Sequence, residues 1–344
     1  MDRRSFLAAT GVAMAAQPSF QGKPVVKFGI DLFSIRSQGW SPFEYLDYCA
    51  KWKANVVHFS EIRFLGSLEE SHLKKVRAHA DRLGIELEIG MRSICPTSKA
   101  FDPAQGTAEE QVMRMVKAAQ TTGARLVRAF LGTMADRTGS IPIEGHIENT
   151  VRVLKAVRSR VLDAGVRIAV ENHAGDMQAR ELRMLIEEAG KDFVGACIDS
   201  GNPLWTLEDP HLTLEVLHPY SVTSHVRDSA IWRVPEGVAV KWVRMGEGNV
   251  DLDGYVRKFL ELCPGRALSL EVLVTQPRVF SYLDPEFWEG YRNVRAWEFS
   301  RFLALAERGK PHEGLPPAPK EEAAQRERED LEASIRHCQK LLMI

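Results

Sequence analysis

The sequence predicts a (β/α)8 TIM barrel, an α/β fold in which eight parallel strands alternate with helices. Eight short runs are apolar and rich in β-branched residues, a helical pattern follows each of them, and glycines end several of these helices. The runs cover residues 25–33, 55–61, 85–91, 125–131, 166–171, 193–199, 221–227 and 267–273. A doubly wound open sheet is the alternative, but no Gly-x-Gly-x-x-Gly motif follows the first run.

The pattern within the runs supports a parallel sheet. Residues 166–170 are almost continuously apolar, which is typical of a strand buried on both faces. Segments 68–83 and 143–163 place apolar residues at helical spacing. Glycines that are typical of helix ends follow the helical segments at Gly84, Gly123, Gly165 and Gly190. We expect the eighth helix at about 285–308. Aromatic residues are frequent there, and we attribute them to packing in the core.

The two ends of the chain differ from this repeat. Arg3 and Arg4 precede a small apolar run at 8–16, which ends in a small-x-small sequence, Ala13-Met14-Ala15. Residues 1–20 therefore resemble a twin-arginine export signal, which implies a periplasmic protein. The barrel is expected at 25–308. A proline-rich and charged linker and a terminal amphipathic helix follow at 309–344, where the helix docks on the barrel or on a partner subunit of a homo-oligomer.

Composition excludes several classes of protein. A formal net charge of -1 argues against nucleic-acid binding, which needs clustered Lys and Arg. No apolar run reaches the ~18–20 residues of a membrane span. The five cysteines are scattered and never spaced as Cys-x-x-Cys, so neither a disulfide framework nor a zinc–thiolate site is expected.

Four successive strands end in a residue that can bind a metal. The fifth to eighth runs end in or next to Glu171, Asp199, His225 and Glu271. Catalytic groups of a TIM barrel lie at the carboxyl ends of its strands, so these four side chains are expected to converge. An ionised group at the end of a buried strand is costly unless it is paired or binds a cation. Three carboxylates and one imidazole form a mostly hard site, which suits manganese, magnesium, cobalt or zinc.

Around these residues the chain resembles the sugar phosphate isomerase/epimerase superfamily of xylose-isomerase-like TIM barrels. The similarity covers about residues 25–308, and its most specific motifs are Glu171-Asn172-His173, Asp199-Ser200-Gly201-Asn202, His225-Val226-Arg227-Asp228, the 246–251 loop and Glu271. The resemblance implies that the four ligands hold one divalent ion, with manganese the first expectation. It also implies that Glu171 and Glu271 form the carboxylate pair that moves the proton.

Six further residues are candidates for substrate binding. The resemblance assigns His173 to substrate or to the surroundings of the metal, and His58 stands on the second strand where relatives often carry Glu. Arg227 and Asp228 follow the His ligand, and Trp205 lies in a loop where a sugar face could stack. Asn202 departs from the ketose epimerases, which usually have His there, so their substrate recognition does not carry over.

The expected function is that of a metal-dependent isomerase or epimerase acting on a small-molecule carbohydrate. A metal bound to a carbonyl and its neighbouring hydroxyl stabilises the enediolate that forms when the adjacent proton is removed. A lyase, dehydratase or hydrolase acting on a 3-keto glycoside or a cyclitol is the alternative. DNA repair is disfavoured, because AP endonucleases of this fold need additional His ligands. A phosphate on the substrate stays open, since the Gly246–Gly248 loop could bind one or could cap a helix near Asp251.

The export signal gives a first testable prediction. The mature protein from its native host should begin after Ala15 or Ala16, as N-terminal sequencing would show. A double variant, Arg3→Lys with Arg4→Lys, should accumulate in the cytoplasm with its first residues uncleaved, because the export machinery reads both arginines. Normal export of that double variant would contradict the interpretation.

Overall fold

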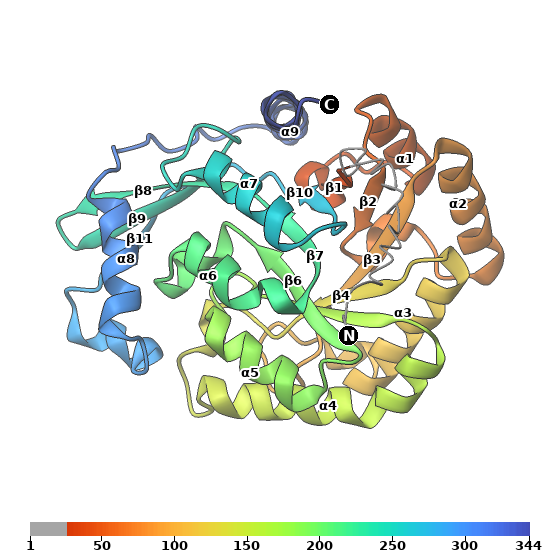
Figure 1. The fold of residues 1–344 in the computed structure, drawn as a ribbon, viewed down its shortest axis with the longest axis horizontal. Helices are drawn as coiled ribbons and strands as arrows, with labels where there is room; N and C mark the ends of the chain where they lie inside the picture. The colour runs from red at the N-terminus through yellow and green to blue at the C-terminus, as the bar shows by residue number, and fades with distance from the viewer. Residues whose placement is uncertain (1–25) are drawn as a thin grey trace, which may run out of the picture.

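The computed structural model describes residues 26–344 and confirms the barrel (Figure 1). Eight parallel strands close in the order β1-β10-β7-β6-β5-β4-β3-β2. They are β1 (Phe28–Asp31), β2 (Val56–Phe59), β3 (Glu86–Ser93), β4 (Leu126–Phe130), β5 (Arg167–Glu171), β6 (Val194–Asp199), β7 (Ser221–Val226) and β10 (Leu268–Leu270). Each lies within one of the eight predicted runs or overlaps it. The signal predicted at 1–20 lies outside the described residues and stays a prediction.

Seven helices surround the barrel in sequence with its strands. They are α1 (Pro42–Lys51), α2 (Glu70–Leu83), α3 (Ala108–Thr122), α4 (Ile143–Asp163), α5 (Ala179–Ala189), α6 (Pro210–Leu217) and α7 (Leu252–Leu262). Gly84 and Gly123 end α2 and α3 in the left-handed conformation, at φ of 68° and 74°. Glycine adopts this conformation without steric cost, which is why the two helices stop there.

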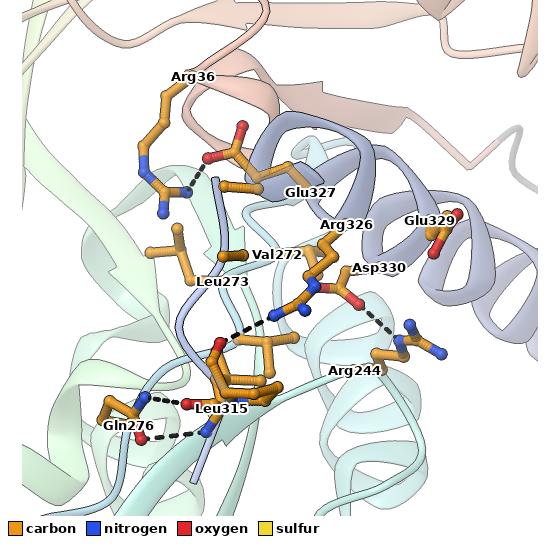
Figure 2. Close-up of a pocket in the computed structure, with 14 residues that line it drawn as sticks. Arg36, Arg244, Val272, Leu273, Gln276, Leu315, Arg326, Glu327, Glu329 and Asp330 are labelled. Atoms are coloured by element: carbon orange, nitrogen blue, oxygen red, sulfur yellow. Dashed lines mark hydrogen bonds and ion pairs between the residues drawn. The ribbon is translucent and has the colours of Figure 1, made fainter. Parts of the chain in front are cut away.

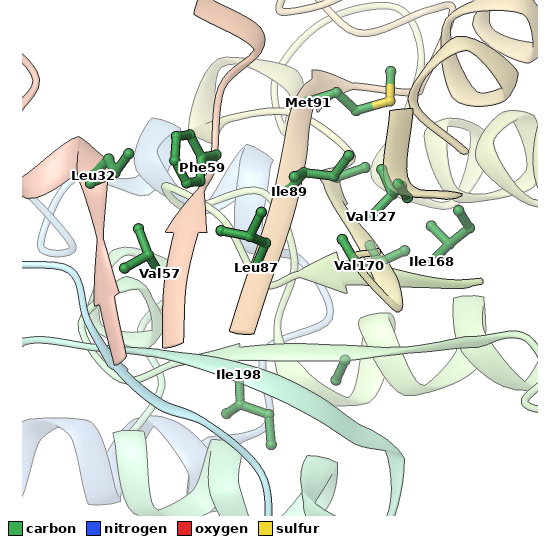
Figure 3. Close-up of a cluster of buried hydrophobic side chains, with 14 of the residues drawn as sticks. Leu32, Val57, Phe59, Leu87, Ile89, Met91, Val127, Ile168, Val170 and Ile198 are labelled. Carbon is green, nitrogen blue, oxygen red and sulfur yellow. The ribbon is translucent and has the colours of Figure 1, made fainter. Parts of the chain in front are cut away.

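The alternation of side chains along the strands separates the core from the site. Val57, Leu87, Val127 and Val170 (Figure 3) belong to the main hydrophobic core, together with apolar residues of the surrounding helices. Successive residues of a strand point to opposite faces, so their neighbours point into the barrel. Those neighbours include the polar residues His58, Glu88, Arg128 and Glu171, all of them buried. The barrel interior is therefore largely polar, and the apolar core lies between strands and helices.

A small antiparallel sheet beside the barrel was not predicted. It has the order β11-β9-β8, formed by β8 (Asp228–Val234), β9 (Gly237–Val243) and β11 (Arg278–Phe280). Two apolar, β-branched segments around Pro235-Glu236 carry the signal for this hairpin.

The prediction of one long barrel helix at 285–308 was wrong, both in the length of the helix and in the part of the fold on which it packs. A 3-10 helix (Pro285–Tyr291) and the shorter α8 (Ala296–Ala306) stand there instead. The aromatic residues that suggested one long helix pack on the small sheet, where Phe302 joins a core with Ile231 and Phe280.

The terminal helix α9 (Lys320–Leu342) completes the ring of helices. It lies between α7 and α1 in Figure 1, and side-chain hydrogen bonds join it to both: Tyr48 of α1 donates to Glu332, and His337 is 3.0 Å from Asp253 of α7. Leu331 and Ile335 of α9 are fully buried in the main core. The predicted terminal helix therefore closes the barrel wall of its own chain.

Docking on the barrel accounts for the apolar face of α9 without a partner subunit. Homo-oligomerisation through this helix was the other expectation, and it stays a prediction. Among the described residues, no helix combines the length and the hydropathy that crossing a membrane requires.

The position of α9 predicts that it contributes to global stability. Ile335→Ala should lower the free energy of unfolding by about 2–5 kcal/mol, because it removes fully buried methylene groups from the main core. Ile344→Ala is the matched control, since Ile344 is 47% exposed and should change stability little. Urea unfolding of both variants checks this, and equal stability would show that α9 is dispensable for the barrel.

Candidate metal centre and active-site pocket

The four predicted ligands converge at the carboxyl ends of β5, β6, β7 and β10. One potential ligand atom from each of Glu171, Asp199, His225 and Glu271 lies within 4.8 Å of those of the other three. All four side chains are buried, and Glu271, at 5%, is the most exposed. The structure thus brings together in one place residues that are up to 100 positions apart in the sequence.

Local hydrogen bonds fix the orientation of the Asp199 and Glu171 carboxylates. Asp199 Oδ1 accepts hydrogen bonds from the backbone N–H groups of Gly201 and Asn202, at 2.7 and 2.6 Å. Its Oδ2 accepts from Arg227 Nε at 2.8 Å and lies 2.7 Å from a terminal nitrogen of the same guanidinium. Glu171 is held in the same way, because the Asn202 side-chain amide donates to Oε1 at 3.0 Å and leaves Oε2 turned toward His225.

The imidazole of His225 provides a test of whether these residues fit a metal ion. Its Nδ1 is buried and has no hydrogen-bond partner within residues 26–344, yet it lies 3.1 Å from Glu171 Oε2 and 2.9 Å from Glu271 Oε2. A nitrogen lone pair and two carboxylate oxygens repel one another unless a positive charge lies between them. A proton or a metal ion meets that need, and the donor set of three carboxylates and one imidazole suits a divalent ion.

Two arginines supply permanent positive charge beside the ligands. Arg128 on β4 pairs with Glu171, and Arg227, just after β7, pairs with both Asp199 and Glu271. Gly201 makes room for Arg227, since a Cβ at this position would lie 2.2 Å from Arg227 Cγ. These arginines lower the cost of burying three carboxylates in one place.

The same charges set the protonation of the ligands. Burial opposes ionisation of Glu271, but Arg227 and His225 outweigh it and lower its pKa to about 2. Burial likewise acts on Glu171, yet Arg128 and His225 hold its pKa well below the usual range. For Asp199 burial prevails over Arg227, and the pKa rises to about 7. Glu171 and Glu271 are therefore ionised at neutral pH.

A second buried group of polar residues supports His225 from below. His225 Nε2 lies 2.9 Å from His58 Nδ1 and 3.2 Å from Asp31 Oδ2. Burial first, and then the neighbouring charge of His225, hold the pKa of His58 well below its ordinary value, so His58 is neutral and its Nδ1 can accept. When Nδ1 of His225 binds a cation, Nε2 carries the ring proton and donates to this pair, which fixes the ring orientation.

A small pocket opens above the ligands at the barrel mouth. Its volume is about 180 Å³, and Arg128, Phe130, His173 and Glu271 are among its lining residues. His173 stacks on Phe130 with the ring centroids 3.8 Å apart, and its Nδ1 lies 2.8 Å from the Gly132 carbonyl oxygen. Burial is the main cause that lowers its pKa to about 4, so the ring is neutral, donates through Nδ1 and keeps Nε2 as an acceptor. A neutral acceptor suits a substrate hydroxyl.

The other predicted substrate residues fall into different places. Asn202 and Arg227 contact the ligand carboxylates, and His58 lies beneath them. Asp228 does not reach the pocket, because its Oδ2 accepts the backbone N–H groups of Gly246 and Gly248. Those two amides hold the loop to Asp228 and are not turned to a phosphate. The cap of α7 is the side chain of Asp251, which accepts from the Gly254 N–H, and not the Gly246–Gly248 loop that was expected to cap it.

Trp205 lines a larger cavity outside the pocket.

All five cysteines are free and buried, which agrees with the absence of a disulfide framework.

Sequence reasoning missed Arg128, Asp31 and Glu88. Each is a charged residue at an inward position of an apolar strand, and that interruption was the available signal. Glu88 and Arg128 lie within their strands, and Asp31, which ends β1, lay inside the longer predicted run 25–33, so none of the three stood at a predicted strand end.

A separate cleft of about 520 Å³ lies between α9, the segment before it and the loop after β10 (Figure 2). Ion pairs such as Arg244–Asp330 and Arg36–Glu327 cross it. None of the four ligands lines this cleft, so it joins the terminal helix to the barrel and is distinct from the metal centre.

Comparison with known proteins identifies the family. Residues 46–286 match the model of the xylose isomerase-like TIM barrel family, and the chain belongs to that family. The expected superfamily is thereby confirmed.

The chain is also similar to individual proteins whose names differ in function. A 3-oxo-isoapionate decarboxylase of Pectobacterium atrosepticum is 23% identical over 210 residues, which cover 60% of this chain and 69% of the relative. Among solved structures, D-psicose 3-epimerase of Clostridium cellulolyticum has a TM-score of 0.58 at 14% identity, covering 81% of this chain and 96% of its own. The IOLI protein, solved with a zinc atom, has a TM-score of 0.55 at 16% identity over 81% and 96% of the chains.

The converging ligands predict metal binding that depends on both the ligands and the residues beneath them. Asp199→Asn should abolish the binding of a single divalent ion, whereas His58→Ala should weaken it by about 10–100-fold, the usual effect of losing a ligand's support. His79→Ala on the outer side of α2 is the control and should bind normally. Titration calorimetry with Mn²⁺ measures all three, and unchanged affinity in Asp199→Asn would refute the ligand assignment.

Proposed function

We propose that this protein is a divalent-metal-dependent isomerase or epimerase of a sugar or sugar derivative. The observation that carries the proposal is the convergence of two ionised carboxylates, Glu171 and Glu271, with Asp199 and His225 beneath a small pocket at the barrel mouth. Manganese is the expected ion, with magnesium, cobalt and zinc as alternatives. When bound, such an ion would stabilise the negative charge that develops on a substrate oxygen after deprotonation.

The two carboxylates are not equivalent. Glu271 lines the pocket, whereas Glu171 is fully buried and is held by Arg128 and Asn202. Glu271 is therefore the group that removes the proton next to the substrate carbonyl. Glu171 enters from β5, three strands away from β10 in the barrel order, and so approaches from another side and returns the proton.

The pocket lining provides the remaining contacts for a polyhydroxylated substrate. His173 offers an acceptor, and Arg128 extends along the same wall with donors. The buried Asn202 Oδ1 lacks a hydrogen-bond partner in the described part of the chain and offers a further acceptor next to Glu171. These groups would orient the carbon that loses its proton toward Glu271 and keep water out.

The place where the proton returns decides the product. Return to the opposite face of the same carbon inverts it, and return to the neighbouring carbon converts an aldose to a ketose or the reverse. If a leaving group stands beside the carbanion, the same first step expels it. The relationship to a decarboxylase therefore favours a second candidate, a lyase, dehydratase or hydrolase that acts on an oxidised 3-keto glycoside or a cyclitol. A panel of free sugars and 3-keto glycosides separates the two candidates by product.

Glutamine substitution tests the proton transfer directly. Glu271→Gln and Glu171→Gln retain size and one possible oxygen ligand but lose basicity, so turnover should fall by about 10²–10⁴ in metal-loaded protein. Product formed in deuterated water should carry deuterium at the carbon next to the carbonyl. Near-normal turnover in both variants would show that another group, such as His173 or His58, is the base. Unlabelled product would indicate a direct hydride shift.

A further inference from the structure

The inner pocket is small for a complete ligand site, and a second cavity lies next to it. Ligand sites commonly occupy about 300–1,000 Å³, whereas the pocket above Glu271 has about 180 Å³. The second cavity has about 720 Å³. Thr133, in the loop after β4, lines both, so the two spaces adjoin at the barrel mouth.

The walls of the second cavity are mainly aromatic and apolar. Loops after β4, β5 and β6 form one side, and β11 with the 3-10 helix at 285–291 forms the other. The apolar part of the lining consists of Met134, Trp205, Val279, Phe280, Phe287 and Tyr291. Val279 is 49% exposed although it is apolar, which indicates that this wall is open to a ligand.

A stack of side chains connects this cavity to the metal centre. The Arg227 guanidinium lies over the Trp242 ring at 4.4 Å, Trp242 stacks on Trp205 at 4.5 Å, and Arg278 covers the far face of Trp205 at 4.6 Å. Arg227, which pairs with Asp199 and Glu271, is therefore linked through Trp242 to Trp205, and Trp205 forms part of the cavity wall. The indole Nε1–H of Trp205 is also buried without an acceptor among residues 26–344.

The charges around the cavity favour a neutral occupant. Arg137 is already paired with Glu181, and the acidic Asp284 and Glu286 line the same cavity as Arg278. An anionic group such as a phosphate would meet these carboxylates. A flat, uncharged ring would instead gain contact with the aromatic walls.

We propose that the second cavity is a subsite for an aromatic aglycone, so that the substrate is a glycoside whose sugar ring occupies the inner pocket. This inference rests on the proposed function, because it assumes that the inner pocket holds the sugar. The aglycone would lie against Val279 and Phe287 while the sugar carbonyl faces Glu271. A free monosaccharide would leave the larger cavity unfilled.

Paired ligands that differ only in the aglycone test the subsite. The methyl and phenyl 3-keto glycosides of glucose and galactose, in both anomers, are titrated calorimetrically into the manganese-loaded protein. The phenyl compound should bind at least about tenfold tighter than its methyl partner in one or more pairs, since it buries an aromatic ring. If no phenyl compound exceeds its methyl partner, the subsite is refuted.

Two surface variants locate the effect. Val279→Glu places a charge in the cavity and should remove the phenyl preference while methyl glycoside binding stays unchanged. Leu283→Glu is the matched control, because Leu283 is 63% exposed and does not line the cavity, and it should keep the full preference. A preference that survives Val279→Glu would place the aglycone elsewhere. Binding is measured here without turnover. If the protein proves not to be an isomerase, the binding result still stands, so failure of the subsite and failure of the proposed function can be told apart.

Discussion

The constraint on which the site depends is the burial of several negative charges at one end of the barrel. Glu171, Asp199 and Glu271 lie side by side and almost out of contact with water. Such a group is stable only when positive charge accompanies it, and the chain provides Arg128 and Arg227 for that purpose. Nδ1 of His225, which has no hydrogen-bond partner within residues 26–344, lies next to Glu171 and Glu271, where a proton or a metal ion would complete the balance.

The charged and polar partners also make the two carboxylates of Glu171 and Glu271 unequal. Asn202 and Arg128 hold Glu171 in the barrel, whereas Glu271, which follows a short strand, reaches the pocket. The small sheet contributes as well, because Trp242 from β9 packs against Arg227 and so fixes the guanidinium beside Glu271. An insertion outside the barrel thereby supports the centre inside it, and α9 closes the wall behind β10.

The sequence allowed the eight strands and the four ligands to be predicted because both follow local rules. The spacing of the apolar residues and the glycines at the helix ends locate the strands, and the carboxyl ends of parallel strands meet at one face of the barrel. The small sheet escaped because its strands directly follow the His225 motif and resemble a loop after a barrel strand. The closing helix was assigned to 285–308, since aromatic content does not reveal whether a helix packs on the barrel or on a neighbouring sheet. Arg128 escaped because a charge inside a strand gives no indication of its partner across the barrel.

The most direct test of this account is the position of a metal in crystals grown with Mn²⁺, located by anomalous scattering. The account predicts one strong peak bonded to Nδ1 of His225 and to carboxylate oxygens of Asp199, Glu171 and Glu271, with Arg227 still beside Asp199. A structure in which no peak appears among these four residues at saturating Mn²⁺, or in which the ion lies instead between Asp31 and His58, would contradict it.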